Sequence, residues 1–157
     1  MVVKPVPEGY HTLTPYLIVK GAAPALDFYA KALGATELFR LASPAGKVGH
    51  AEMKIGDSHF MLADEFPDRG AVGPQAGGGH CVSFLVYVPS VDAAFARAVA
   101  AGAKAVRPVQ DQFYGDRSGT LQDPFGHQWT LATHIEDVSP EEMQRRFETM
   151  MKPEGGA

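Results

Sequence analysis

The stretch HTLTPYLIV at residues 11–19 returns 69 positions later as HCVSFLVYV at residues 80–88. In both copies an alanine-rich run follows and stops at a glycine, which is Gly34 in the first copy. This period is too long for most solenoid repeats, whose units span roughly 20–50 residues. We therefore expect two duplicated modules that pack together.

The length and charge of the chain limit its architecture and its partners. With 157 residues the chain has the usual size of one domain, which we assign to residues 1–157. A module of roughly 65 residues would bury only a marginal core alone. The formal net charge is −4, from 18 acidic and 14 basic side chains, and the basic residues form no cluster. We therefore expect no nucleic-acid or membrane partner and favour a small-molecule ligand.

Cysteine content and hydropathy indicate the compartment. Cys81 is the only cysteine and lies in an apolar run, so the chain cannot form an internal disulfide. A reducing compartment is the simplest explanation. No apolar stretch approaches the ~20 residues that span a bilayer, and the N-terminus lacks an export signal. We expect a cytoplasmic protein.

Each copy predicts the same order of elements, βαβββ. In the first copy, apolar residues at helical spacing predict a helix at 23–33, and turn residues divide the strands that follow. The turn at 56–59 matches the turn at 123–127 of the second copy. We place module one at about 11–65, a linker rich in glycine and proline at about 66–79, and module two at about 80–134. The expected strands are 13–19, 37–41, 48–55 and 59–63 in module one, and 82–88, 105–109, 118–123 and 128–133 in module two, with the second helix at 91–101.

A C-terminal helix is predicted at about 140–151. Ser139 is a suitable N-cap, Pro140 fits the first helical position, and Glu142 lies three residues after the cap. One face of this helix is apolar, and we expect it to dock against the protein body or a second subunit. That face consists of Met143, Phe147, Met150 and Met151.

Local motifs in both modules resemble those of a known superfamily. LDFY at residues 26–29, and DPFG at residues 123–126 before the last strand, are similar to the glyoxalase/bleomycin-resistance/extradiol-dioxygenase fold, also called the vicinal oxygen chelate superfamily. Further segments resemble its PhnB-like subgroup, mostly of unassigned function. The resemblance implies an α+β fold in which two βαβββ modules curl their sheets into a cup with the helices outside, in a homodimer. The PhnB-like segments are residues 14–17, 50–52, 61–65, 115–117 and 123–129.

The resemblance also implies four inward positions at which enzymes of the superfamily bind a divalent metal. In this chain they are occupied by Thr14, Leu62, Ser83 and Thr130. A catalytic metal requires imidazole or carboxylate donors, which hydroxyl and aliphatic side chains do not supply. A one-residue slip of register brings no ligand to any of the four positions. We therefore predict neither a metal nor another cofactor, and we expect these four residues to line the ligand site.

Alternation along the strands predicts which other side chains face the cup. On the first strand, Leu13 and Leu17 should pack under the helix. Tyr16, Phe60 and Tyr87 should face inward and offer flat apolar surface to a ligand ring.

Arg117 and His134 lie in module two and have competing interpretations. Arg117 could clamp a carboxylate or phosphate of the ligand through a bidentate contact. It could equally form a structural link that pins a loop to the module. His134 is predicted to be only a residue at the end of the last strand.

His50 and Glu52 are two residues apart on the third strand, and therefore on one face, opposite Ala51. An imidazole beside a carboxylate can act as a general base, or both can ligate a metal, if they lie in a shielded pocket. Asp64 continues the expected inward set of the fourth strand and would complete the cluster. The alternative is a solvated strand face with a weak local pair.

Two functions follow from the residues and the resemblance. The first is a metal-independent protein that binds a small, partly aromatic molecule in the cup by shape and hydrogen bonds. The second is a metal-dependent lyase, isomerase or dioxygenase-type enzyme with a displaced site at His50 and Glu52. A scaffold without a ligand is a third possibility, because fold alone does not fix function.

Overall fold

A computed structural model describes residues 3–75 and 78–151 of the chain, so two positions of the predicted linker, 76 and 77, lie outside it. The sequence repeat is also a structural repeat: each half folds as βαβββ. The first half contains β1 (Tyr16–Val19), α1 (Ala22–Leu33), β2 (Thr36–Ala42), β3 (Val48–Ile55) and β4 (Ser58–Asp64), followed by the 3-10 helix η1 (Pro67–Arg69). The second half contains β5 (Phe84–Tyr87), α2 (Val91–Ala100), β6 (Lys104–Asp111), β7 (Asp116–Gln122) and β8 (Gln128–His134), and is followed by α3 (Pro140–Met151).

The eight strands form two separate four-stranded sheets with the same topology. Sheet 1 has the order β1-β4-β3-β2 and sheet 2 the order β5-β8-β7-β6. The parallel pairs coincide under the 69-residue offset, since Leu17 lies opposite Leu62 and Val86 lies opposite Leu131. The predicted α+β fold of two βαβββ modules with a C-terminal helix is therefore confirmed.

The last strand of each module anchors the start of that module's helix. Asp64 accepts hydrogen bonds from the backbone N–H groups of Gly21 and Ala22 at the start of α1, at 3.1 and 2.8 Å. Thr133, 69 residues later, accepts one from the N–H of Val91 at the start of α2, at 2.9 Å. The first N–H groups of a helix have no partner within the helix, so these side chains satisfy them.

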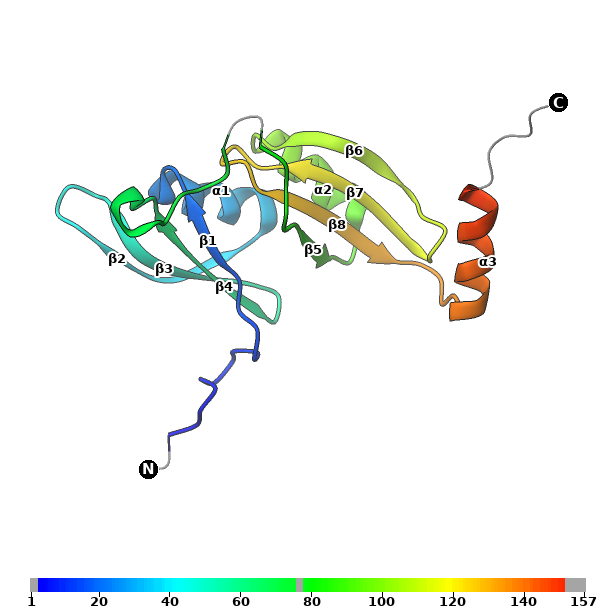
Figure 1. The fold of residues 1–157 in the computed structure, drawn as a ribbon, viewed down its shortest axis with the longest axis horizontal. Helices are drawn as coiled ribbons and strands as arrows, with labels where there is room; N and C mark the ends of the chain where they lie inside the picture. Colours follow the sequence, from blue (N-terminus) through cyan, green and yellow to red (C-terminus); the bar gives the residue numbers. More distant parts are fainter. Residues whose placement is uncertain (1–2, 76–77, 152–157) are drawn as a thin grey trace.

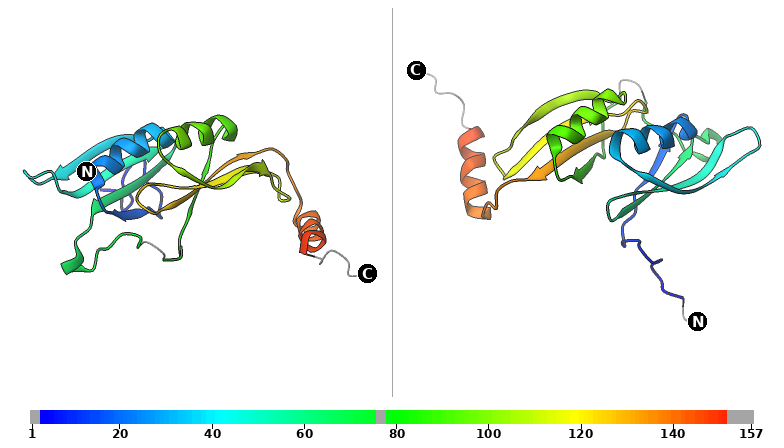
Figure 2. Two further views of the ribbon diagram at one scale, coloured as in Figure 1. Left: turned by 90° about the horizontal axis from the view of Figure 1, so that it is seen from above. Right: turned by 180° about the vertical axis from the view of Figure 1, so that it is seen from behind.

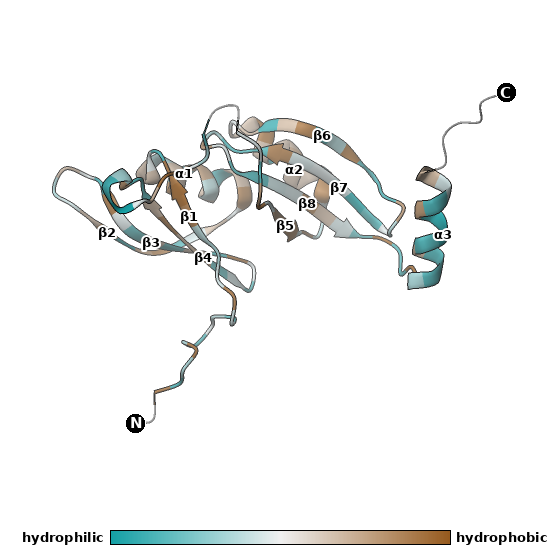
Figure 3. Cartoon of the chain, viewed as in Figure 1, coloured by the Kyte–Doolittle hydropathy of each residue, from teal (hydrophilic) through white to brown (hydrophobic). Residues whose placement is uncertain are grey.

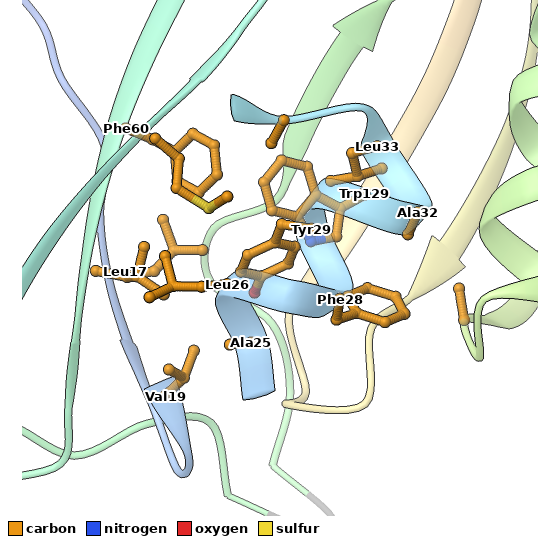
Figure 4. Packing of buried hydrophobic residues seen from close by; sticks show 14 of the residues in the cluster. Leu17, Val19, Ala25, Leu26, Phe28, Tyr29, Ala32, Leu33, Phe60 and Trp129 are labelled. Carbon is orange, nitrogen blue, oxygen red and sulfur yellow. The ribbon is translucent and has the colours of Figure 1, made fainter. Parts of the chain in front are cut away.

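Helices α1 and α2 lie on the same side of the molecule and pack against each other (Figure 2). The core lies between the helices and the two sheets (Figure 4). Its centre is an aromatic group from both modules, in which the ring of Tyr29 lies 5.7 Å from Phe60 and 5.5 Å from Trp129. The two modules therefore share one core.

Asp123 is the polar centre of this core and is only 4% exposed. Its carboxylate accepts hydrogen bonds from the Tyr29 hydroxyl at 2.6 Å and the Trp129 indole N–H at 2.9 Å. It also accepts the backbone N–H groups of Phe125 and His127, both at 2.9 Å. A buried carboxylate is tolerated only when it is fully hydrogen-bonded, which is the case here. Burial, and secondarily the Asp123 charge, raises the pKa of the Tyr29 hydroxyl, which keeps it a donor.

Helix α3 stands clear of both sheets at the end of the molecule (Figure 1). Arg146 tethers it by hydrogen bonds to Glu136 at 2.8 and 3.0 Å and to the carbonyl of Phe113 at 3.1 Å, and the Phe113 and Phe147 rings lie 5.8 Å apart. Its apolar face nevertheless stays largely exposed, with Met150 at 57%. The body of its own chain therefore covers this face only in part, and docking of α3 against a second subunit stays a prediction.

Two further details bear on the predictions. The opening strands are shorter than predicted, and Leu13, expected under the helix, precedes β1 and is 87% exposed. Among the described residues, no helix is long and apolar enough to cross a membrane.

Candidate functional site

Each sheet has one face covered by a helix and one that carries no helix, here called the helix-free face. On sheet 1 the cross-strand neighbours Tyr16, Met61, Glu52 and Phe39 share this face, because directly paired residues point the same way. His50 shares it by alternation with the buried Ala51. The predicted placement of Tyr16, His50 and Glu52 on one face is confirmed.

These side chains form a continuous chain of hydrogen bonds, here called the His50 network. Nδ1 of His50 lies 2.8 Å from the Tyr16 hydroxyl, and Nε2 lies 3.2 Å from Oε1 of Glu52. The Tyr10 hydroxyl donates to Oε2 of Glu52. The Phe39 ring lies 5.7 Å from the His50 ring and extends the network with apolar surface.

The protons of the network follow from its partners. The arrangement is satisfied when the N–H at Nε2 of His50 donates to the Glu52 carboxylate and Nδ1 accepts from the Tyr16 hydroxyl. Burial raises the pKa of the Tyr16 hydroxyl, which keeps it protonated as this donor. Both imidazole nitrogens and both carboxylate oxygens are then engaged, so the network fixes its rings and leaves the Tyr16 oxygen free to accept a hydrogen bond.

Tyr10 was not identified from the sequence, and it brings the N-terminal segment onto the site. Its ring stacks on His59 at 4.1 Å, in addition to the bond with Glu52. A hollow of about 470 Å³ results between this segment and sheet 1. Thr14, Glu52 and Met61 contribute to its lining, as does Tyr10. The aromatic side chain of Tyr10 is the one sequence feature that hinted at a place in the site, because its hydrogen-bond partner Glu52 lies 42 residues away in the chain.

Asp64 does not join His50 and Glu52. Its carboxylate holds the first N–H groups of α1 and accepts a further bond from the N–H of Val48 at 2.7 Å. Three backbone donors occupy it on the helix side of sheet 1. Its predicted place in the cluster is therefore wrong, and its role is structural.

Phe60 and Leu62 also lie on the opposite face from the one predicted. Leu62 is fully buried beside Ala51 and belongs to the core under α1. Phe60 is 5% exposed and packs on Tyr29 and Trp129. Met61, between these two residues, lies on the helix-free face opposite Tyr16. The predicted register of β4 was therefore wrong by one residue.

With this correction, the positions at which the superfamily binds a metal contain Thr14, Met61, Ser83 and Thr130. Hydroxyl and thioether groups do not make a catalytic site for a divalent metal. The hydroxyl of Thr130 is bonded to that of Thr120 at 2.9 Å, and Ser83 is exposed ahead of β5. Within residues 3–75 and 78–151, no three His, Cys, Asp or Glu side chains are grouped to hold a metal ion. The residues present do not fit a metal.

Sheet 2 has a second polar cluster on its helix-free face, here called the Asp116 network. Asp116, at the start of β7, is 4% exposed and lies opposite His134 of β8. It accepts a hydrogen bond from the Tyr87 hydroxyl at 2.9 Å and one from Nδ1 of His134 at 2.8 Å. Nε2 of His134 bonds to Asp137 at 2.8 Å. Tyr87 lies on this face as predicted, whereas Asp116 and His134 were missed as a pair.

Arg117 lies on the helix side of sheet 2. It makes a bidentate pair with Asp92 of α2, with both distances 2.9 Å, and a further bond to Asp111 at 2.9 Å. These bonds raise the pKa of Arg117 and lower that of Asp92. Of its two predicted roles, the structure supports the structural link; its expected place in the ligand site is wrong.

A groove of about 670 Å³ lies between the two modules. One wall is formed by β5, including Leu85 and Tyr87, and the other by the β3–β4 turn with His59. Apolar surface therefore continues from the helix-free face of sheet 2 toward sheet 1.

Comparison with known proteins identifies the family. Residues 10–131 match the Glyoxalase/Bleomycin resistance protein/Dioxygenase superfamily. An uncharacterized protein of Mycobacterium bovis is 42% identical over 135 residues, which cover 84% of this chain and 89% of that protein.

Two solved structures show the same fold. TioX from Micromonospora sp. ML1 is 29% identical with a TM-score of 0.64, and the match covers 80% of this chain and 99% of TioX. A PhnB protein from Bacillus cereus is 19% identical with a TM-score of 0.62, covering 78% of this chain and 99% of that one. This chain belongs to the glyoxalase/bleomycin resistance protein/dioxygenase superfamily.

Proposed function

We propose that this protein binds a small, partly aromatic molecule against its helix-free faces without using a metal. The observation that carries the proposal is the His50 network, which holds the rings of Tyr10 and Tyr16 in place through bonds that engage every potential metal-binding atom of His50 and Glu52. Fixed aromatic rings bind planar ligands with little loss of conformational entropy. The absence of basic clusters supports a small molecule over a nucleic acid.

We further propose that a second copy of the chain completes the cup. Helices α1 and α2 lie on one side of the molecule (Figure 2). The two helix-free faces of one chain therefore open to the same side and do not enclose a space between them. Tyr16 is 48% exposed and Tyr87 is 62% exposed, and β1 and β5 are strongly apolar (Figure 3). A two-fold related copy would set sheet 1 of one chain over sheet 2 of the other and form two cups.

The first prediction tests binding and the role of a metal together. We expect 2-naphthol to bind with the same affinity before and after dialysis against EDTA, and Tyr16→Ala to weaken this binding about tenfold because the fixed ring is lost. Isothermal titration calorimetry measures both. Tyr16→Phe keeps the ring but removes its hydrogen bond to His50, so it should weaken binding less than Tyr16→Ala does.

One observation favours the alternative function, a metal-dependent enzyme at His50 and Glu52: their side chains do meet, at 3.2 Å. In that case EDTA would abolish binding, the purified protein would contain stoichiometric metal, and Glu52→Gln would remove it. Any of these results would contradict the metal-independent proposal.

The second prediction tests whether the cup is shared between two chains. We expect a dimer of twice 16.8 kDa in sedimentation experiments. Tyr16→Ala impairs sheet 1 and Tyr87→Ala impairs sheet 2, so each variant alone has two damaged cups. When the two variants are unfolded and refolded together, each mixed dimer should regain one intact cup and with it 2-naphthol binding.

Without restored binding in the mixture, the cup would belong to a single chain, and a monomer in solution would contradict the shared cup outright.

The single Cys81 and the lack of a disulfide favour a reducing compartment, and we propose that the protein is located in the cytoplasm.

A further inference from the structure

The Asp116 network consists of a histidine held between two carboxylates, and within one chain it lies on the other sheet from the His50 network. Its starting point is the burial of Asp116, whose 4% exposure leaves it dependent on its two donors, Tyr87 and His134. Removing a carboxylate from water is unfavourable unless it is hydrogen-bonded. The arrangement fixes the His134 ring and places the proton of Nδ1 toward Asp116, as an orienting carboxylate does for a functional histidine.

The other ring nitrogen of His134, Nε2, bonds to Asp137, and this is the bond that holds the Asp137 side chain. Nε2 donates to Asp137, whose side chain is fully exposed in the segment between β8 and α3. Within the described part of the chain, Asp137 has no other hydrogen bond. Asp137 and then Asp116 raise the pKa of His134, because two carboxylates stabilise the doubly protonated ring.

Asp137 is not required to hold α3 in place. The segment is already fixed by the backbone N–H groups of Ile135 and Glu136, which donate to the carbonyl of Gly115 at 2.9 and 3.0 Å. The Glu136–Arg146 pair then ties this segment to α3. The carboxylate of Asp137 therefore contributes little as a tether, and its main effect is to occupy the N–H of His134.

The surroundings of His134 suit a ligand with a flat apolar part. Tyr87 exposes most of its side chain on the same face. Ser118, 4% exposed, lies on this face, and its hydroxyl is 3.5 Å from that of Tyr114. A planar ring beside a fixed N–H donor is the arrangement that recognises an aromatic carboxylate.

We propose that His134 binds the carboxylate of an aromatic acid, and that Asp137 is an internal carboxylate that the ligand displaces. This inference rests on the proposed function, since it names the class of ligand for the same cup. Oriented by Asp116, Nε2 of His134 donates to the ligand carboxylate once Asp137 swings into solvent. Asp137 thereby lowers the affinity for any ligand that must take its place on His134.

The test compares 2-naphthoate with its neutral analogue 2-naphthamide by calorimetry at pH 7. We expect the unmodified protein to prefer the carboxylate modestly, and Asp137→Asn to increase this preference about tenfold, because the internal competitor is removed. His134→Gln should abolish the preference, with folding checked by circular dichroism. Glu141→Gln is the matched control, since it removes the same charge nearby from a side chain without a hydrogen bond in the described chain, and should behave as the unmodified protein.

A purely structural Asp137 would give the opposite outcome, with the preference unchanged or reduced in Asp137→Asn. That result, or a preference that survives His134→Gln, would overturn the inference while leaving the proposed function standing. Failure of both naphthalene compounds to bind any variant would instead count against the proposed function itself. Because the Asp137 side chain is exposed, Asp137→Asn should fold normally, so a change in its ligand preference reports on binding and not on misfolding.

Discussion

Replacing Asp123 with alanine should lower the free energy of unfolding by about 4 kcal/mol, because the Tyr29 hydroxyl and the Trp129 indole N–H would lose their acceptor inside the core. The backbone N–H groups of Phe125 and His127 would lose theirs in the adjoining turn. In a domain of this size the melting temperature should fall by about 10 °C. Urea unfolding followed by fluorescence and circular dichroism measures the change.

Asp68→Ala provides the comparison for Asp123. Asp68 is an exposed carboxylate in η1, and its replacement should change stability by less than about 0.5 kcal/mol. If Asp123→Ala cost less than about 1 kcal/mol, Asp123 would not be the polar centre of the shared core.

Leu62→Ala should destabilise the protein by about 2–5 kcal/mol, whereas Met61→Ala should cost less than about 1 kcal/mol. The two residues are adjacent on β4, but Leu62 is fully buried under α1 and Met61 lies on the helix-free face. Met61→Ala should instead alter 2-naphthol binding, because Met61 lines the hollow beside Glu52. Paired denaturation curves and titrations separate the two effects.

The reverse order of stabilities would restore the register that the sequence first indicated for β4. Equal losses would place both side chains in the core. Either result would remove the basis for assigning Met61, and not Leu62, to the position on β4 where the superfamily binds a metal.

The fold was predictable because the duplication is visible in the strands themselves. β1 and β5 repeat with a fixed offset, and Gly34 ends α1 with a positive φ of 66°, as expected of a helix-stopping glycine. The faces of β3 were also readable, since His50 and Glu52 alternate with the apolar Ala51. The register of a strand can be inferred from sequence when one of its faces is polar and the other apolar.

The register of β4 was not readable from alternation, because Phe60, Met61, Leu62 and Ala63 are apolar on both faces. The turn at 56–59 has one residue fewer than the turn at 123–127. Matching these two turns therefore shifted β4 by one residue against β8 and paired Leu62, in place of Met61, with Thr130. Had the 69-residue offset of the opening strands been applied to β4 and β8, Met61 would have matched Thr130, as the two parallel pairings show.

The polar networks depend on contacts between distant segments, which spacing within one strand does not reveal. Asp64 was predicted to join His50 because it continued the inward set of β4, and the one-residue error in that register placed it on the wrong face. Asp116 and His134 are 18 residues apart and meet only because β7 and β8 pair. A sequence alone does not contain that register.

The aromatic contact between Tyr29 and Trp129 has a consequence for the history of the chain. A lone first βαβββ unit would leave Tyr29 and Phe60 less covered, since the Trp129 ring that packs on both belongs to the other half. An ancestor of that size would have had to associate with a twin to exclude water from those rings. Joining two such units in one polypeptide would turn the surface between them into the core that the two halves now share.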